Sequence, residues 1–210
     1  DGFNQTILTS ERVALNFLGH LSGLASLTRK FVDRVAGTKC KVLDTRKTTP
    51  GWRLLQKAAV KHGGGVNHRM GLYDMILIKD NHIASAGSIK SAVESVREYL
   101  DSPDLHQQFD LEPDQVPLEV EVTDENQVRE AIAQGVDRLL LDNQTIESLT
   151  RLVALARELA LDIILEASGN VTLENVAAIA GSGVDYVSIG AITHSAPVTD
   201  FSLQFTAIEQ

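Results

Sequence analysis

The amino-acid sequence predicts an α/β fold built as a barrel of parallel strands. Short apolar runs alternate evenly with amphipathic runs, and the apolar runs are nearly continuous, as in parallel sheets whose faces are covered by helices. The chain also has no Gly-x-Gly-x-x-Gly turn that would mark a dinucleotide crevice. This combination favours a barrel over a doubly wound sheet.

The composition is that of an ordinary globular domain. Hydrophobic residues make up 43% and charged residues 22% of the 210 residues, which excludes collagen-like, low-complexity and wholly disordered classes. The net charge of −9 argues against general binding of nucleic acid or of anionic membranes. The single cysteine, Cys40, offers no intrachain disulfide, and no apolar run approaches the roughly 20 residues that span a bilayer. We therefore expect a cytoplasmic protein with one domain over residues 1–210.

The first expected element is a long helix from about Leu8 to Val35, with Thr9 or Ser10 as its cap. Six apolar runs are expected strands: Lys41–Leu43, Met75–Ile78, Leu118–Val122, Leu139–Leu141, Ile163–Leu165 and Tyr186–Ile189. The amphipathic stretches between them are expected helices: Leu54–Val60, Ile89–Leu100, Val128–Ile132, Ile146–Leu159 and Leu173–Ile179.

The stretch 101–117 interrupts this alternation. It holds three of the chain's five prolines, together with acidic and amide side chains. We interpret it as a loop insertion within the barrel domain. Because it joins a helix to the next strand, it is expected at the N-terminal face of the barrel, away from the face where such barrels carry their chemistry.

Basic side chains gather near the ends of the first two expected strands. Arg46 and Lys47 follow the first strand, His68 and Arg69 precede the second, and Lys79 follows it. A charge run is usually a solvated surface, but these residues are scattered in sequence and are brought together only by the fold. In an acidic chain, such convergence predicts a site for a small molecule with several negative groups.

Acidic side chains form a second group. Glu119 and Glu121 share one strand face, with their Cα atoms about 6.6 Å apart, and Asp142 follows the next strand. These carboxylates either pair structurally with the nearby cations, or hold ribose hydroxyls or a hydrated Mg²⁺.

Small residues follow the last two expected strands. They are Ser168 and Gly169 after one strand and Gly190 after the other. Small residues let backbone N–H groups approach a ligand, and the loops after the last strands of such barrels often bind phosphate. A Ser-Gly pair serves equally well as an ordinary turn, so both interpretations stay open.

These residues, taken with their neighbours, resemble the quinolinate phosphoribosyltransferase family in order and over nearly the whole chain. The segments that carry the resemblance are Glu11-Arg12, Leu15-Asn16, Leu21-Ser22-Gly23, Asp44 to Gly51, Gly63-Gly64-Gly65, Asn67-His68-Arg69, Lys79-Asp80-Asn81-His82, Glu119-Val120-Glu121-Val122, Leu141-Asp142-Asn143, Glu166-Ala167-Ser168-Gly169 and Ser188-Ile189-Gly190. Together these segments are far more specific than any one of them.

The resemblance implies a pentosyltransferase of NAD biosynthesis. Such an enzyme converts quinolinate and 5-phosphoribosyl 1-pyrophosphate to nicotinate mononucleotide, pyrophosphate and CO₂, with Mg²⁺ as its cofactor. It also implies an incomplete, open barrel of about six or seven parallel strands. In the family, an α/β sandwich domain precedes the barrel, and it is expected to be absent from this chain. A homodimer or higher homo-oligomer with a site shared between subunits is implied as well.

The resemblance further implies a quinolinate-binding set. Arg46, His68, Arg69 and Lys79 would hold the two carboxylates of quinolinate, and Arg12 would reach in from a neighbouring subunit.

The remaining implied roles concern the sugar donor. Lys47 would meet its pyrophosphate as a catalytic residue, and Glu121 and Asp142 would contact its ribose and, indirectly, its Mg²⁺. Three small residues would bind its 5′-phosphate: Ser168, Gly169 and Gly190.

Two alternatives and one conflict remain. The chain could belong to a related phosphoribosyltransferase for another carboxylated ring, such as the relatives found with molybdate transport, or be an inactive anion-binding barrel fragment. The conflict concerns residues 63–71, which the simple strand-helix order puts at the far face of the barrel, whereas the resemblance puts His68 and Arg69 in the site. A short extra strand near Val66–Arg69 would resolve it.

Overall fold

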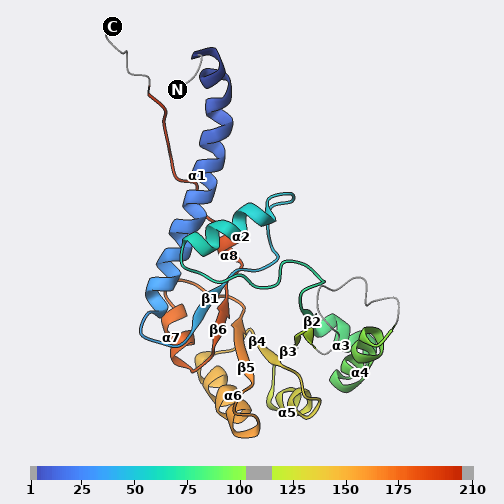
Figure 1. The fold of residues 1–210 in the computed structure, drawn as a ribbon. Helices are drawn as coiled ribbons and strands as arrows, with labels where there is room; N and C mark the ends of the chain where they lie inside the picture. The colour runs from blue at the N-terminus through green and yellow to red at the C-terminus, as the bar shows by residue number, and fades with distance from the viewer. Residues whose placement is uncertain (1–3, 103–114, 205–210) are drawn as a thin grey trace.

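Six parallel strands form one sheet in the order β1-β6-β5-β4-β3-β2 (Figure 1). The strands are β1 Lys41–Leu43, β2 Ile76–Ile78, β3 Leu118–Val122, β4 Arg138–Asp142, β5 Ile164–Ser168 and β6 Tyr186–Ser188. The computed structural model describes residues 4–102 and 115–204. Within these residues β1 and β2 are the two edges of the sheet, so the predicted open barrel is confirmed.

A single residue extends the sheet beyond β1. Val66 forms a parallel bridge with Leu43, in which its N–H donates to Val42 O at 2.8 Å. Val66 therefore lies on the free edge of β1, at the gap in the barrel. The extra strand expected near Val66–Arg69 is present in this reduced form, and it carries His68 to the carboxyl end of the sheet rather than to the far face.

Eight helices are found in the described residues: α1 Asn4–Val35, α2 Arg53–His62, α3 Asp80–Ala86, α4 Ile89–Leu100, α5 Glu125–Ala133, α6 Ile146–Leu159, α7 Val176–Gly181 and α8 Ala191–His194. The sequence did not predict α3, which has no buried residue, or α8, which has only four residues, so neither presents a clear apolar face. The helix expected from Leu173 begins only at Val176, because Thr172 N–H donates to Asn175 Oδ1 at 2.8 Å and closes a turn before it.

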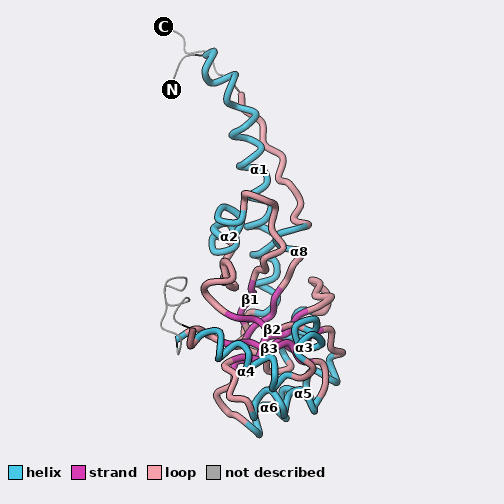
Figure 2. The backbone as a smooth tube through the Cα atoms, turned by 90° about the vertical axis from the view of Figure 1, so that its right-hand side faces the viewer, coloured by secondary structure: helices cyan, strands magenta, loops and turns pink. Residues whose placement is uncertain are grey.

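The long helix α1 begins earlier than expected, and the predicted cap is wrong. Thr9 and Ser10 lie inside the helix, where their hydroxyls donate to the carbonyl oxygens of Gln5 and Thr6, one turn back, at 2.7 and 2.8 Å. The N-terminal half of α1 extends away from the sheet, with the last described residues running beside it (Figures 1 and 2). Within residues 4–102 and 115–204, no helix combines the length and the apolar character needed to cross a membrane.

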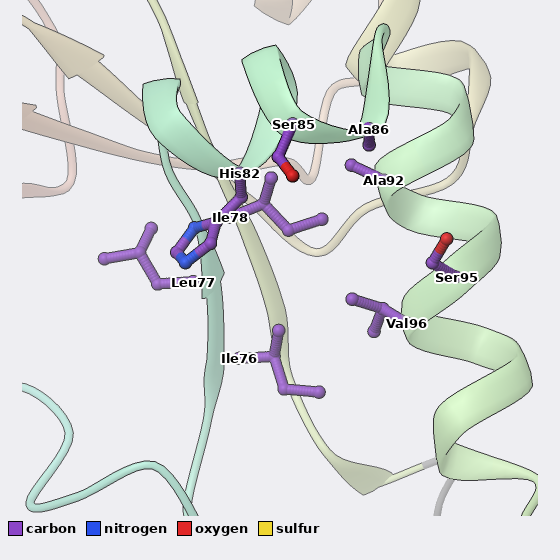
Figure 3. A pocket seen from close by; sticks show the side chains of 9 residues that line it. All are labelled: Ile76, Leu77, Ile78, His82, Ser85, Ala86, Ala92, Ser95 and Val96. Carbon is purple, nitrogen blue, oxygen red and sulfur yellow. The ribbon is translucent and has the colours of Figure 1, made fainter.

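Strand alternation separates an outer apolar layer from a polar interior. Val120 and Val122 of β3 are fully buried within the hydrophobic core, while Glu119 and Glu121 point to the other side. The same alternation appears in β2, where Ile76 and Ile78 point towards α4 and Leu77 points the opposite way (Figure 3). The interior of the barrel is therefore free to carry charged side chains.

The predicted insertion at 101–117 lies mainly outside the described residues, which omit 103–114. Its last residue, Pro117, accepts a hydrogen bond from Ile76 N–H at 2.9 Å, at the amino end of β2. This end of the insertion is therefore on the N-terminal face, as expected.

Candidate active site at the carboxyl ends of the strands

Two adjoining cavities open at the carboxyl ends of the strands. The larger has a volume of about 510 Å³ and the smaller about 250 Å³. Five residues line both: Thr45, Lys47, Lys79, Ser168 and Ser188. Because these walls are shared, the two cavities form one site with two compartments.

Every site residue predicted from the sequence except Arg12 lines one or both compartments. The smaller compartment adds Arg46, His68 and Arg69 to the shared walls, and the larger adds Glu121, Asp142, Gly169 and Gly190. Arg12 is exposed on α1 and lines neither cavity in the described part of the chain.

The smaller compartment concentrates positive charge, part of which lacks a protein partner. The Nε atom of Arg46 is buried and, among the described residues, has no hydrogen-bond partner. Burial and then the nearby charge of Arg46 lower the pKa of Arg69. These two guanidinium groups repel each other, and one of them has an Nε donor without an acceptor. Together they are suited to hold an anion with more than one negative group.

Residues 45–51, which carry Arg46 and Lys47, are fixed from two sides. Gln56 of α2 is fully buried, and its Oε1 accepts a hydrogen bond from Thr49 N–H at 2.9 Å. Thr193 of α8 donates through its hydroxyl to Lys47 O at 2.8 Å. The unpredicted helix α8 therefore helps to hold the loop that supplies two of the site's cations.

An ion pair joins the two compartments. Lys79 Nζ lies 2.5 Å from Glu121 Oε2, and Lys79 lines both cavities. The carboxylate of Glu121 is nearly buried while the ammonium of Lys79 is half exposed. The predicted quinolinate-binding lysine and the predicted ribose-binding glutamate are thus direct neighbours.

The larger compartment is lined by two carboxylates, Glu121 and Asp142, and by small residues. Burial and then the negative charge of Glu121 raise the pKa of Asp142. Gly169 has a φ of 96°, which a side chain rarely tolerates. A Cβ on Gly190 would lie 3.1 Å from His194 Nε2 and 3.3 Å from Lys47 Cδ. Both glycines therefore keep the cavity open.

A buried charge cluster lies beneath the smaller compartment. His68 Nε2 is 3.3 Å from Glu119 Oε2 and 3.2 Å from Glu166 Oε2, and Arg138 reaches both carboxylates at 3.4 and 2.9 Å. Both glutamates are fully buried. For Glu119, the structural pairing left open by the sequence is what is found. Glu166 was expected to follow its strand, but it lies inside β5, because β5 continues to Ser168.

His68 and two glutamates form a close cluster of possible metal ligands. His68 Nε2, Glu119 and Glu166 form the one group of three potential ligands within metal-binding distance in the described residues. Burial opposes a charge on the ring, but hydrogen bonds to the two glutamates outweigh it and raise the pKa of His68 to about 9. Arg69 N–H donates to Nδ1 at 2.7 Å, which favours the neutral ring. A proton on Nε2 would face both carboxylates, Glu119 and Glu166, at 3.3 and 3.2 Å.

The backbone of His68 is held on both sides by a buried ion pair. Asp44 Oδ1 accepts from His68 N–H at 2.8 Å, and Lys57 Nζ donates to His68 O at 2.9 Å. Asp44 and Lys57 lie 2.5 Å apart and are almost completely buried. Asn67 adds a 2.6 Å hydrogen bond to Asp44 Oδ2. The segment that carries His68 and Arg69 is therefore rigidly placed without regular secondary structure.

Among the residues of the larger compartment to which the sequence analysis gave no role are Asn143, Asn170 and His194. The two asparagines follow β4 and β5 closely, so the rule that strand ends meet at the mouth could have found them. His194 lies in the four-residue α8, which no periodicity indicates.

A further groove of about 510 Å³ lies between β2, α3 and α4 (Figure 3). Its walls are mostly apolar, and Ile76, Ile78 and Val96 are among them. None of the predicted site residues lines it.

Comparison with known proteins identifies the family of this fold and site. A family model for the C-terminal domain of quinolinate phosphoribosyl transferase matches residues 24–204. The nicotinate-nucleotide pyrophosphorylase (carboxylating) of Mycobacterium leprae is 46% identical over 198 residues, covering 94% of this chain and 65% of the relative. The probable counterpart in Bacillus subtilis is 44% identical over 200 residues, covering 95% and 64%.

Comparison with solved structures identifies the same family. The nicotinate-nucleotide pyrophosphorylase of Francisella tularensis superimposes with a TM-score of 0.84 at 45% identity, covering 96% of this chain and 66% of that one. The chain spans just under two thirds of the length of the curated relatives described above. Because the family model matches most of the chain, this protein belongs to the quinolinate phosphoribosyl transferase family, through that family's C-terminal domain.

Proposed function

We propose that this chain is the barrel part of an enzyme that converts quinolinate and 5-phosphoribosyl 1-pyrophosphate to nicotinate mononucleotide, pyrophosphate and CO₂. The observation that carries the proposal is the orphaned, buried Nε of Arg46 in a compartment that Lys47 and Arg69 also line. A donor left without an acceptor is costly, and a substrate carboxylate would satisfy it.

The two compartments suit the two substrates. The smaller cavity has cationic walls plus the apolar side chains of Leu77 and Leu140, which suit a flat ring bearing two carboxylates. The larger cavity, lined by Lys47, Glu121, Asp142 and the turn at Gly169, suits a phosphorylated sugar with a pyrophosphate group. Their shared wall would hold the ring nitrogen and the anomeric carbon next to each other.

The charges also suit the chemistry. As pyrophosphate leaves the anomeric carbon, Lys47 would stabilise the departing negative charge, and Glu121 and Asp142 would stabilise the positive sugar that the ring nitrogen attacks. The quaternised ring then accepts the electron pair released when the adjacent carboxylate leaves as CO₂, and the ring carbon that carried it takes up a proton from water. Arg46, Arg69 and Lys79 would orient the two carboxylates during these steps.

The larger compartment fits Mg²⁺ as a cofactor. Mg²⁺ is usually held by one or two carboxylates together with phosphate oxygens and water. Glu121 is close enough to raise the pKa of Asp142, so the two carboxylates form a repelling pair that a divalent cation would stabilise. When bound, Mg²⁺ would supply positive charge to the pyrophosphate. The shared, dimeric site and the cytoplasmic location stay predictions from the sequence.

The test is to supply the purified chain with both substrates and Mg²⁺ and to quantify pyrophosphate and CO₂. Release of both products, with quinolinate consumed and nicotinate refused, is expected. Replacing Arg46→Ala should lower kcat/KM for quinolinate about ten- to a hundredfold, the cost of one charge-assisted hydrogen bond.

Arg129→Ala is the matched control, because Arg129 is exposed on α5 away from both compartments. Activity of Arg46→Ala equal to that of this control would contradict the assignment. Turnover of another carboxylated ring in place of quinolinate would point to the related phosphoribosyltransferases instead, and no turnover at all to an anion-binding barrel.

A further inference from the structure

Two asparagines in the larger compartment adopt a backbone conformation that side chains usually avoid. Asn143 has a φ of 51° and Asn170 a φ of 49°, and they are the only non-glycine residues with positive φ in the described chain. Each follows the carboxyl end of a strand, β4 and β5 respectively. After glycine, asparagine is among the residues that adopt the left-handed region most readily, because its short polar side chain forms local hydrogen bonds. The contacts of these two side chains are therefore of interest.

The side chains of these asparagines form a directed chain of hydrogen bonds. Asn170 Nδ2 donates to Asn143 Oδ1 at 3.1 Å, and Asn143 Nδ2 donates to Asp142 Oδ2 at 2.6 Å. The carboxylate at the end can only accept, which fixes the orientation of both amides. Asn143 N–H also donates to Ser168 O at 2.9 Å. One residue thus ties the carboxylate after β4 to the Ser-Gly turn after β5.

The turn after β5 is shaped to receive this amide. A Cβ built on Gly169 would overlap the side-chain oxygen of Asn143 and lie 3.0 Å from Asn143 N. The Asn143 side chain is therefore packed against the bare Cα of Gly169. Any movement of Asn143 is transmitted both to Asp142 and to this turn.

We infer that Asn143 is a positioning residue that sets the orientation of the Asp142 carboxylate relative to the Ser168-Gly169 turn, and so makes the larger compartment selective for a 5-phosphorylated ribose. The inference rests on the proposed function, in which those two groups bind opposite ends of the sugar donor. In the described structure no group donates to Asp142 Oδ1, so the contact with Asn143 leaves that oxygen for a ligand. Asn143 is placed to act through Asp142 and the turn.

The test compares Asn143→Gly with Asn143→Ala. Glycine accepts a positive φ without strain, whereas alanine keeps the strain, and both lose the amide. Both variants should raise the KM for 5-phosphoribosyl 1-pyrophosphate about tenfold, the lower range for a hydrogen bond to a charged group. The Kd for quinolinate, measured by calorimetry, should stay within about twofold of the parent value. Only the alanine variant should unfold at a lower temperature.

Asn170→Gly tests the second hydrogen bond of the series, which runs from Asn170 to Asn143. It should raise the same KM by a smaller factor, because it removes the support of Asn143 and not the contact with Asp142. In the double variant the combined increase should be smaller than the product of the single increases, since both act through one contact. Independent, multiplicative effects would overturn the inference, as would a KM for the sugar donor that is unchanged in Asn143→Gly.

A binding measurement separates this inference from the proposed function. Ribose 5-phosphate, titrated calorimetrically into the unaltered chain and into Asn143→Gly, should bind the variant about tenfold more weakly. If the unaltered chain produces no pyrophosphate but this difference persists, the proposed reaction fails and the positioning role stands. Equal affinities in the two proteins would overturn the positioning role whatever the turnover.

Discussion

At the scale of single residues, the most demanding contact is the buried pair of Asp44 and Lys57. Both side chains are about 1% exposed or less, and they lie 2.5 Å apart. Burial opposes charge on each partner, raising the pKa of Asp44 and lowering that of Lys57. The pair is stabilised because its remaining hydrogen-bonding capacity is used on the backbone of His68 and on Asn67.

Removing one partner of this pair should lower the free energy of unfolding more than removing both. Lys57→Met leaves Asp44 buried without its cation, and the free energy of unfolding in urea should fall by about 3–5 kcal/mol. Adding Asp44→Asn should recover part of the loss. Lys61→Met, on an exposed position of the same helix, is the control and should change little. If Lys57→Met matched this control, the pair would not contribute to stability.

The identity of the site's charged residues could be predicted from the sequence, but their partners could not. The convergence of Arg46, Lys79 and Asp142 follows from the parallel barrel alone. Glu119 pairs with His68 below the mouth of the barrel, whereas Glu121 lies at the mouth and pairs with Lys79. The position of His68 depends on where residues 63–69 cross the barrel. One bridge at Val66 decides this, and a one-residue bridge has no sequence period.

At the scale of elements, the packing of α1 on the last described residues depends on two glycines one turn apart. A Cβ on Gly19 would meet Thr199 O, and one on Gly23 would overlap the backbone of Pro197. Thr199 N–H also donates to Gly19 O at 3.0 Å. The close approach of the two backbones therefore requires that this face of α1 carry no side chain.

Gly23→Ala should force the segment around Pro197 away from α1. Overpacking against backbone typically costs about 1–3 kcal/mol, so the urea midpoint should decrease. Gly181→Ala is the matched control, because Gly181 lies in helix α7 with open space where its Cβ would be. It should leave stability unchanged or slightly raised. Equal midpoints for the two variants would show that the segment yields without cost.

Among the elements, the strands could be predicted well because apolar runs bounded by polar residues mark them clearly. The start of α1 could not be predicted, because the hydroxyls of Thr9 and Ser10 can donate to carbonyl oxygens inside a helix as well as cap its start. The helices α3 and α8 could not be predicted either, because α3 buries no residue and α8 has only four residues, so neither shows a clear hydrophobic period.

At the scale of the whole molecule, the N-terminal half of α1 exposes several large apolar side chains to solvent. Leu8, Val13 and Leu18 are 57%, 59% and 48% exposed, and Leu54 of the adjacent α2 is 72% exposed. Surfaces of this kind usually mark contacts between proteins. Arg12 lies on the same stretch, which agrees with the predicted homo-oligomer in which it serves a neighbouring subunit.

Complementation between two inactive variants tests that arrangement. Arg12→Ala and Lys47→Ala should each lose activity, because one removes the group donated to the neighbour and the other a group of the chain's own site. Co-expressed, they should regain part of the activity, since a mixed dimer contains one site with both residues intact. Failure of the mixture to exceed the single variants would mean that the site is not shared.

The ion pair between Lys79 and Glu121 also has a consequence for how the two compartments communicate. An anion that draws Lys79 towards the smaller cavity leaves Glu121 more negative in the larger one, which changes its attraction for a cationic or hydroxylated ligand. Thermodynamic coupling of this kind is reciprocal. Each ligand must therefore alter the affinity for the other by the same factor, so that neither half of the site can be tuned in isolation.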